Sequence, residues 1–262
     1  GISARSLVKD IERVTEDDRV KAVVFRVDSP GGDGLASDIV AEAIRKCTER
    51  KPVVVSQGAV AGSGGYWISM YGDTIVAAPS TITGSIGVIG GWLYDAGLYG
   101  KLGVTTDGVS IGRHADLGVG GPGGLPVRPL SAEERRIRQD NILEFYEIFL
   151  EKVAEGRGRT RDEIHEIAQG RVWSGTDGLE IGLVDVIGGL DRAIGIAREM
   201  AGIGPDEPVR IVERPVPPLF DPGDLLRRNV DPGLRSGLVE ELLLPGGLRD
   251  YLRFLIEHNG EI

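Results

Sequence analysis

The sequence predicts an α/β fold with a mostly parallel sheet, followed by a helical C-terminal part. In the first 110 residues, short β-branched runs alternate with helical patterns, which is typical of repeated βαβ units. After residue 130, the strand signals give way to long segments with helical periodicity. At 262 residues, the chain is long enough for one large domain or two small ones.

The signals of the first part follow one another closely. The β-branched run "VKAVVFRV" (20–27) predicts a first strand, and "PVVVSQ" (52–57) predicts a second. Between them, apolar residues at helical spacing over 39–47 predict a helix and place Cys47 on its buried face. "TIVAAP" and "SIGVIGG" then predict two further short strands, because each is an apolar run bounded by turn residues.

The second part begins after a loop-like stretch, "GVGGPGGLPVRP". Two capping boxes, in which a hydroxyl and a carboxylate stand three residues apart, predict the starts of two helices: Ser131 with Glu134, and Thr160 with Glu163. The pattern "LDRAIGIAREMAG" predicts a third helix.

These signals predict where the domain ends. We expect a domain at 1–204, with its helical part at about 131–202. The tail at 205–262 is rich in proline and glycine but ends in the helical pattern "LRDYLRFLIEH". We therefore expect it to be a C-terminal extension that packs on another surface.

The composition argues against several classes of partner. A formal net charge of −10 argues against nucleic acid, because phosphate binding needs a basic face. The single cysteine cannot form a disulfide within the chain, and the three histidines are too scattered for a clustered metal motif. We therefore expect neither a metal nor a cofactor.

The chain shows no candidate for a membrane span. The first stretch, "GISARSLVKDIERV", is amphipathic and charged, unlike a secretory signal peptide. The uncharged stretch 74–94 is interrupted by Pro79 and by glycines, which favours strands and turns over a spanning helix. We expect this chain to be soluble, and any membrane anchor to lie outside it.

The stretch "GAVAGSGGYWIS" (58–69) sets Ser63 among glycines in the most apolar part of the chain. A serine acts as a nucleophile when it lies exposed on a sharp turn, beside a base and donors for the oxyanion. Gly64 and Gly65 permit such a turn and leave backbone N–H groups uncovered. A second glycine cluster, "VDSPGG", also follows a predicted strand, so we expect both clusters to converge in one site. In the alternative interpretation, the glycines only allow close packing of helix against strand.

Four stretches, in this order, resemble the signal peptide peptidase A family, also called protease IV: "VKAVVFRVDSPGG", "KPVVVSQGAVAGSGGYWIS", "STITGSIGVIG" and "AQGRVWSGTDGLEIGLVDVIGGLDRAI". Members are serine peptidases with the fold shared by Clp protease and the crotonases. The resemblance implies that Ser63 is the nucleophile, and that Gly31 or Gly32 forms the oxyanion hole with the N–H of Gly64. It also implies that Ser85, in "TGSIG", orients a catalytic lysine.

The lysine itself has no match in this chain. The family uses a Ser–Lys dyad, and single-repeat relatives carry the lysine in a stretch that corresponds to "SIGRHADLG", where this chain has Ala115. All six lysines of the chain fit patterns of solvated surface residues: Lys9, Lys21, Lys46, Lys51, Lys101 and Lys152. The chain thus resembles the C-terminal half of tandem members, whose N-terminal half supplies the lysine.

By this resemblance we expect a serine endopeptidase that cleaves peptides such as remnant signal peptides. A partner half or subunit would supply the lysine, within a homo-oligomer. The full-length protein would be associated with the inner membrane of the cell envelope. Four apolar residues near the site, Tyr66, Trp67, Ile86 and Val88, suggest apolar substrate side chains, unless they belong to the core.

Three alternatives remain open at this point. A triad of Ser63, His114 and Asp116 has the right residue types, although a histidine two residues from its aspartate is poorly placed to bridge both partners. A crotonase-like half would bind acyl-CoA and use the same pair of N–H donors. A non-catalytic half would have lost its base and would serve as an interaction module.

Overall fold

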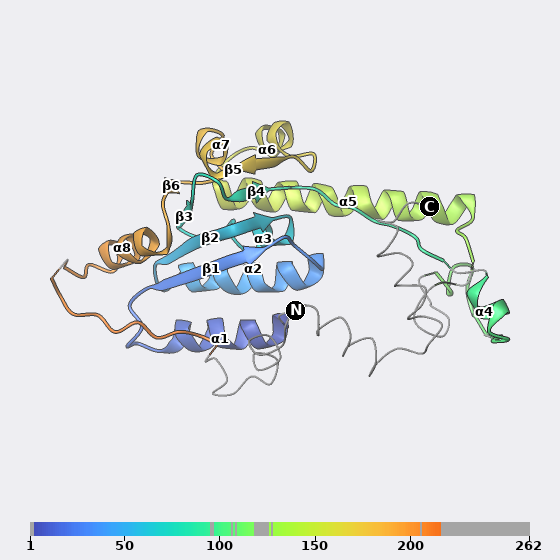
Figure 1. The fold of residues 1–262 in the computed structure, drawn as a ribbon, viewed down its shortest axis with the longest axis horizontal. Coiled ribbons are helices and arrows are strands. Elements are labelled where there is room, and N and C mark those ends of the chain that lie inside the picture. The colour runs from blue at the N-terminus through green and yellow to red at the C-terminus, as the bar shows by residue number, and fades with distance from the viewer. Residues whose placement is uncertain are drawn as a thin grey trace, which may run out of the picture. The chain divides into compact units, whose positions relative to one another are not determined.

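The computed structural model describes residues 3–94, 97–105, 107, 109–117, 126, 128–204 and 206–215. Residues Gly1–Arg210 form one compact unit, in which helices pack on a six-stranded sheet (Figure 1). The second unit, Ile211–Ile262, lies outside the described residues except for its first five, and so does the helical pattern expected near its end.

The described elements alternate as predicted for the first part and are mostly helical afterwards. The strands are β1 (Val23–Ser29), β2 (Val53–Gly62), β3 (Thr74–Ala77), β4 (Ile82–Gly84), β5 (Val172–Ser174) and β6 (Val186–Ile187). The helices are α1 (Ala4–Glu16), α2 (Gly34–Thr48), α3 (Gly64–Trp67), α4 (Leu98–Lys101), α5 (Ala132–Arg157), α6 (Arg161–Ile167), α7 (Gly175–Glu180) and α8 (Leu190–Met200).

The sheet is organised around β2. This strand pairs in parallel with β1, with β3 through its first half and with β4 through its second half. β3 also pairs in parallel with β6, and only the pair of β4 and β5 is antiparallel among the described strands. The predicted α/β class with a mostly parallel sheet is therefore confirmed.

Helices cover both faces of the sheet. On one face, α8 packs through Ala193 and Ile196 on Val54 and Val76. On the other face lie α2 and α3, and α1 packs against the outer side of α2 (Figure 1). The C-terminal half of α5 lies over α3 and α6, whereas its N-terminal half runs past the sheet (Figure 1).

Most of the predicted elements are present, and Cys47 is buried as expected. Both capping boxes are formed at the starts of α5 and α6. The strand predicted over "SIGVIGG" is wrong, because β4 ends at Gly84. Gly84 and Ser85 have φ values of 79° and 49°, which turn the chain out of the ladder. The Ser85 N–H then donates to the Arg171 carbonyl at 2.8 Å instead of to β2.

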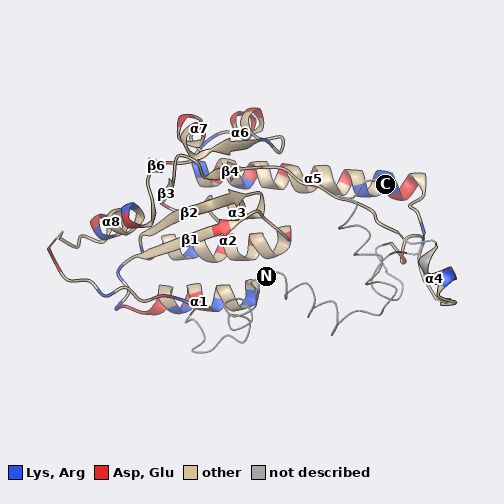
Figure 2. Ribbon diagram, in the orientation of Figure 1, with Lys and Arg blue, Asp and Glu red and all other residues tan. Residues whose placement is uncertain are grey.

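Charged side chains are distributed unevenly over the elements. Acidic and basic residues interleave along α1 and α5, whereas the strands carry few charges (Figure 2). Among the described residues, no helix has the length and apolar character needed to cross a membrane.

Candidate active site

Ser63 lies on a sharp turn between the central strand and a short helix. It follows β2 and is the N-cap of α3, with φ 52° and ψ −119°. Its N–H donates to the Gly84 carbonyl at 2.9 Å, and its carbonyl accepts from the Trp67 N–H at 2.9 Å. Of the described non-glycine residues, only Ser63, Ser85 and Gln169 have a positive φ. Backbone strain of this kind is concentrated at functional sites.

The glycine cluster after β1 lies directly against this turn. A Cβ at Gly31 would lie 2.8 Å from Ser63 Cβ and 2.9 Å from the Gly64 nitrogen. A Cβ at Gly64 would lie 3.2 Å from the Gly32 nitrogen. Only glycine permits so close an approach of the two backbones. The two clusters that the sequence places at successive strand ends therefore meet.

Two backbone N–H groups beside Ser63 have no acceptor among the described residues. The Gly31 N–H donates to Ser29 Oγ at 3.2 Å. Within the described part of the chain, neither the Gly32 N–H nor the Gly64 N–H donates to a protein acceptor. Because α3 has only four residues, its macrodipole adds little, and the available donors are these N–H groups themselves. Of the pair Gly31 and Gly32, the second has the free donor.

Ser85 occupies the corresponding position on the neighbouring strand. Gly62 and Gly84 are register partners in β2 and β4, so Ser63 and Ser85 are the next residues on adjacent strands. A Cβ at Gly62 would lie 3.5 Å from Ser85 Cβ. The structure therefore places both serines at the same edge of the sheet.

No lysine contacts this site among the described contacts. Lys152 is half-buried and pairs with Asp38 at 2.7 Å, and Asp38 also accepts from Trp67 Nε1 at 3.2 Å. Lys51 Nζ donates to the carbonyls of Val14 and Asp17 at 2.7 and 2.5 Å. The expectation that all six lysines are merely solvated is therefore wrong for Lys51 and Lys152, which are held in polar contacts.

The "GRHAD" stretch lies at the first turn of α5. His114 faces two carboxylates, with Nε2 3.5 Å from Glu133 and Nδ1 3.7 Å from Glu134. Asp116 pairs with Arg128 at 2.7 Å. Arg128 also bonds the buried Glu134 and holds the pKa of that carboxyl well below its usual range.

These contacts place His114, Ala115 and Asp116 away from Ser63. Phe145, which contacts Gly34 at the start of α2, lies twelve residues after Glu133, or about 18 Å along the helix. The alternative triad of Ser63, His114 and Asp116 is therefore not assembled in this structure. Contacts with Glu133 and Glu134 hold His114 elsewhere, and the ion pair with Arg128 holds Asp116.

Of the four apolar residues near the site, three lie in the core and one lines a cavity. Tyr66, Trp67 and Ile86 are fully buried in the core between α3 and α5. Tyr66 donates its hydroxyl proton to the Leu183 carbonyl at 3.0 Å, and burial raises the pKa of its hydroxyl. Val88 alone of the four lines a cavity.

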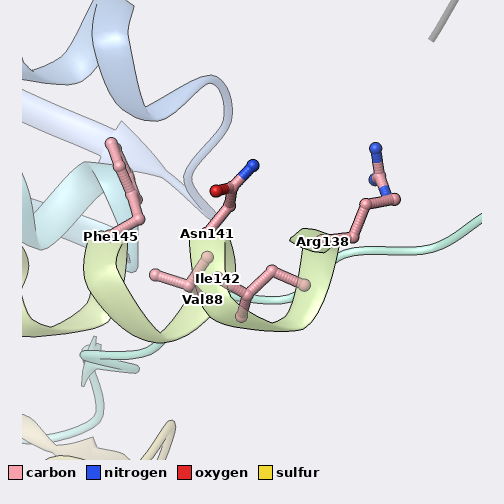
Figure 3. Close-up of a pocket in the computed structure, with 5 residues that line it drawn as sticks. All are labelled: Val88, Arg138, Asn141, Ile142 and Phe145. Carbon is pink, nitrogen blue, oxygen red and sulfur yellow. The ribbon is translucent and has the colours of Figure 1, made fainter. Parts of the chain in front are cut away.

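That cavity, of about 240 Å³, is lined by Val88 and by four residues of α5: Arg138, Asn141, Ile142 and Phe145. In Figure 3, Val88 approaches α5 beside Ile142, and Phe145 stands one turn further along the helix. The sequence analysis missed Phe145. The signal was the pair of aromatic residues four apart in "EFYEIF", which marks an apolar stripe on an otherwise polar helix.

Several known proteases are similar in sequence to this chain. The model of peptidase family S49 matches residues 45–204. The chain is 39% identical to the chloroplastic serine protease SPPA of Arabidopsis thaliana, over 95% of this chain and 36% of that protein. It is 44% identical to Protease 4 of Salmonella typhi, over 71% of this chain and 29% of that protein.

A mutant of ClpP1 from Listeria monocytogenes is 15% identical, with a TM-score of 0.48, over 73% of this chain and 86% of that chain. The chain thus spans about a third of the length of the two curated relatives, 36% and 29%. On the family match and the identity to these relatives, the chain belongs to peptidase family S49.

Proposed function

We propose that this chain is the nucleophile-bearing part of a serine endopeptidase, with Ser63 as the nucleophile. One observation carries the proposal: Ser63 is turned into a positive φ at the end of β2, beside two N–H groups that have no acceptor within the described part of the chain. Such an arrangement suits attack on a carbonyl and stabilisation of the oxyanion that results. Membership of a peptidase family supports the choice of a peptide bond as the target.

In this mechanism, Ser63 Oγ attacks the scissile carbonyl carbon while its proton passes to a neutral lysine amine. The oxyanion accepts hydrogen bonds from the N–H groups of Gly32 and Gly64. Collapse breaks the C–N bond, and the lysine ammonium returns the proton to the leaving amine, which leaves an ester on Ser63. Water then attacks the ester, and the same amine takes the proton from that water and returns it to Ser63 Oγ.

The lysine would come from another polypeptide segment. The six lysines of this chain have no contact with Ser63 or Ser85 among the described contacts, and Ala115 lies at the far end of α5. The two relatives from Arabidopsis thaliana and Salmonella typhi are more than twice as long as this chain, so a tandem half or a second subunit is the source that we propose. Ser85, beside Ser63, would orient the incoming amine.

The substrates would be peptides with apolar side chains, such as remnant signal peptides. The cavity beside the site supports this class, because Val88, Ile142 and Phe145 line it. We further propose that the active form is an oligomer associated with the cell envelope through segments other than those described.

An activity-based probe tests the nucleophile. A fluorophosphonate, which phosphonylates activated serines with loss of fluoride, should label the wild-type assembly and the exposed-turn variant Ser80→Ala alike. Ser63→Ala should lose both the label and peptide hydrolysis. Labelling that persists in Ser63→Ala would rule out Ser63. Labelling of Ser63 by acyl-CoA thioesters without hydrolysis of peptides would favour the crotonase-like alternative.

A further inference from the structure

Phe145 contacts the backbone segments that carry both free N–H donors. A Cβ at Gly34 would fall on the ring atoms Cε1 and Cζ of Phe145, so the ring fills the space beside the first residue of α2. The ring also stacks on Trp67, with centroids 5.3 Å apart and planes at 27°. Gly34 follows Gly32 by two residues, and Trp67 follows Gly64 by three. The Phe145 side chain thus packs against both segments that form the candidate oxyanion hole.

The connection from Gly34 to the donors is tight. Asp33 caps α2 by accepting from the Ala36 N–H at 2.8 Å, and its carbonyl accepts from Ser37 Oγ at 2.9 Å. Ser37 Oγ in turn lies 2.5 Å from where a Cβ of Gly64 would stand. A displacement of Gly34 therefore reaches Gly32 and Gly64 through hydrogen-bonded or close-packed atoms.

The same ring forms a wall of the cavity beside the site. Val88, three residues after Ser85, also lines this cavity, and a Cβ at Gly90 would lie 2.7 Å from Ile142 Cδ1. The chain that leaves Ser85 is therefore packed along α5 (Figure 3). A cavity with this lining suits an aliphatic side chain, while Arg138 and Asn141 supply polar groups on one turn of the helix.

We infer that Phe145 is a positioning and specificity residue that couples this cavity to the oxyanion hole. An aliphatic substrate side chain that fills the cavity packs against the ring and holds it on Gly34 and Trp67. The Gly32 and Gly64 N–H groups are then held where the oxyanion develops. Part of the binding energy of the side chain therefore lowers the activation barrier and raises kcat, instead of lowering KM. The inference rests on the proposed peptidase function.

Substitution of Phe145 separates the two roles in kinetics. The experiment measures hydrolysis of two peptides by the full assembly. The peptides carry leucine or alanine at the position that fills the cavity and are otherwise identical. In Phe145→Leu, kcat for the leucine peptide should fall by about tenfold to a hundredfold, as expected for a small misplacement of catalytic groups. The leucine-over-alanine preference in kcat should fall with it.

Phe149→Leu is the matched control. Phe149 also stacks on Trp67, with centroids 4.2 Å apart, but it does not line the cavity. It should lower the thermal midpoint and leave the leucine-over-alanine ratio unchanged. The inference is overturned if Phe145→Leu keeps the wild-type ratio, or if Phe149→Leu shifts it equally.

Gly34→Ala tests the contact without a change in Phe145. The new methyl displaces the ring, whereas the backbone of Gly34 does not have a positive φ and tolerates alanine. Gly34→Ala should lower kcat for the leucine peptide as Phe145→Leu does. In a Phe145→Ala background, where the ring is absent, it should cost less than threefold, because the two changes act through one contact. Additive losses would contradict the coupling.

Binding to Ser63→Ala distinguishes failure of the inference from failure of the proposed function. Calorimetry with the same peptides should show tighter binding of the leucine peptide, and Phe145→Leu should abolish that difference. If no variant hydrolyses peptides but this pattern holds, the peptidase proposal fails and the cavity assignment stands. If hydrolysis is normal and Phe145→Leu binds both peptides as wild type does, the inference alone fails.

Discussion

At Gly31 and Gly32, neighbouring glycines carry different constraints, which gives a matched pair of substitutions. Gly31 has a φ of 113°, and a Cβ there would lie 2.8 Å from Ser63 Cβ. Gly31→Ala should therefore displace the nucleophile and its donors, and it should lower kcat/KM by about 10²–10³, as loss of an oxyanion donor does. Steady-state hydrolysis by the full assembly measures the loss.

Gly32→Ala is the control for this prediction. No atom lies within 4 Å of where its Cβ would stand, and alanine keeps the N–H donor. The variant should therefore fold as wild type does and lose less activity than Gly31→Ala, because neither the nucleophile nor the donor is displaced. Equal losses of kcat/KM in Gly31→Ala and Gly32→Ala would contradict this prediction. They would mean that the loop depends on the flexibility of both glycines and not on the close approach of Gly31 to Ser63.

The sequence predicted the residues that converge at the site but not the side chains that brace them. Ser63, Gly31, Gly32, Gly64 and Ser85 stand in short motifs at strand ends, where topology brings them together. Phe145 and Lys152 come from a helix about a hundred residues later, and their contacts with Gly34 and Asp38 depend on how α5 crosses the domain. No local spacing encodes that crossing.

At the scale of elements, the first turn of α5 depends on one carboxylate. Glu134 completes the capping box with Ser131 and accepts bonds from Arg128, and Arg128 holds its pKa below the ordinary 4.5. A lowered pKa stabilises the folded arrangement at any pH above the ordinary value, and this contribution is lost as pH falls towards the folded pKa. Hydrogen exchange at Arg135 and Arg136 should therefore accelerate between pH 5 and 3, beyond the intrinsic change.

Glu134→Gln should show the fast exchange already at pH 7 and lose the extra acceleration in acid. Glu144→Gln, an exposed position on the same helix, should exchange as wild type does. If Glu134→Gln leaves the protection of the first turn intact at pH 7, the capping box does not control this end of the helix.

Helices were predicted better than strands because their signals are local. Both capping boxes mark helix starts to within a residue, since the cap is a contact between neighbours in sequence. The strand predicted over "SIGVIGG" failed because strand pairing depends on a partner. Here, Ser85 and Ile86 bond to Arg171 and Gly170, in a loop that the apolar pattern does not reveal.

At the scale of the whole molecule, the split-dyad proposal predicts that this chain alone is a weak catalyst. General-base assistance is worth about 10²–10⁴ in rate, so hydrolysis by the isolated chain should be near background. Small primary amines such as methylamine should raise the rate of the isolated chain at least about tenfold, by entering the space beside Ser63 and Ser85. Rates at several amine concentrations and pH values measure the rescue, and bulky tertiary amines are the control.

Unlike small amines, the substitution Ala115→Lys should not restore hydrolysis by the isolated chain. The contact of His114 with Glu134 and the ion pair of Asp116 with Arg128 hold position 115 at the far end of α5, beyond the reach of a lysine side chain. Full activity of the isolated chain, without amine and without effect of lysine substitutions, would overturn the split-dyad proposal. A histidine base would then have to be sought.

Exposed apolar residues near the site support an oligomer. Leu35 and Ile39 are 67% and 47% exposed on one stripe of α2, and Leu143 is 53% exposed on α5. We expect sedimentation velocity at micromolar concentration to show an assembly larger than a monomer, and Leu35→Glu with Ile39→Glu to dissociate it. Full activity of a sedimenting monomer would contradict this prediction.

The backbone conformation of Ser63, which serves the proposed catalysis, lowers the stability of the fold. A non-glycine residue at φ 52° carries a steric cost of about 1–2 kcal/mol that glycine does not. Ser63→Gly should therefore melt several degrees higher than either wild type or Ser63→Ala, while being inactive. In a lineage released from selection for hydrolysis, stability alone would favour glycine at this position.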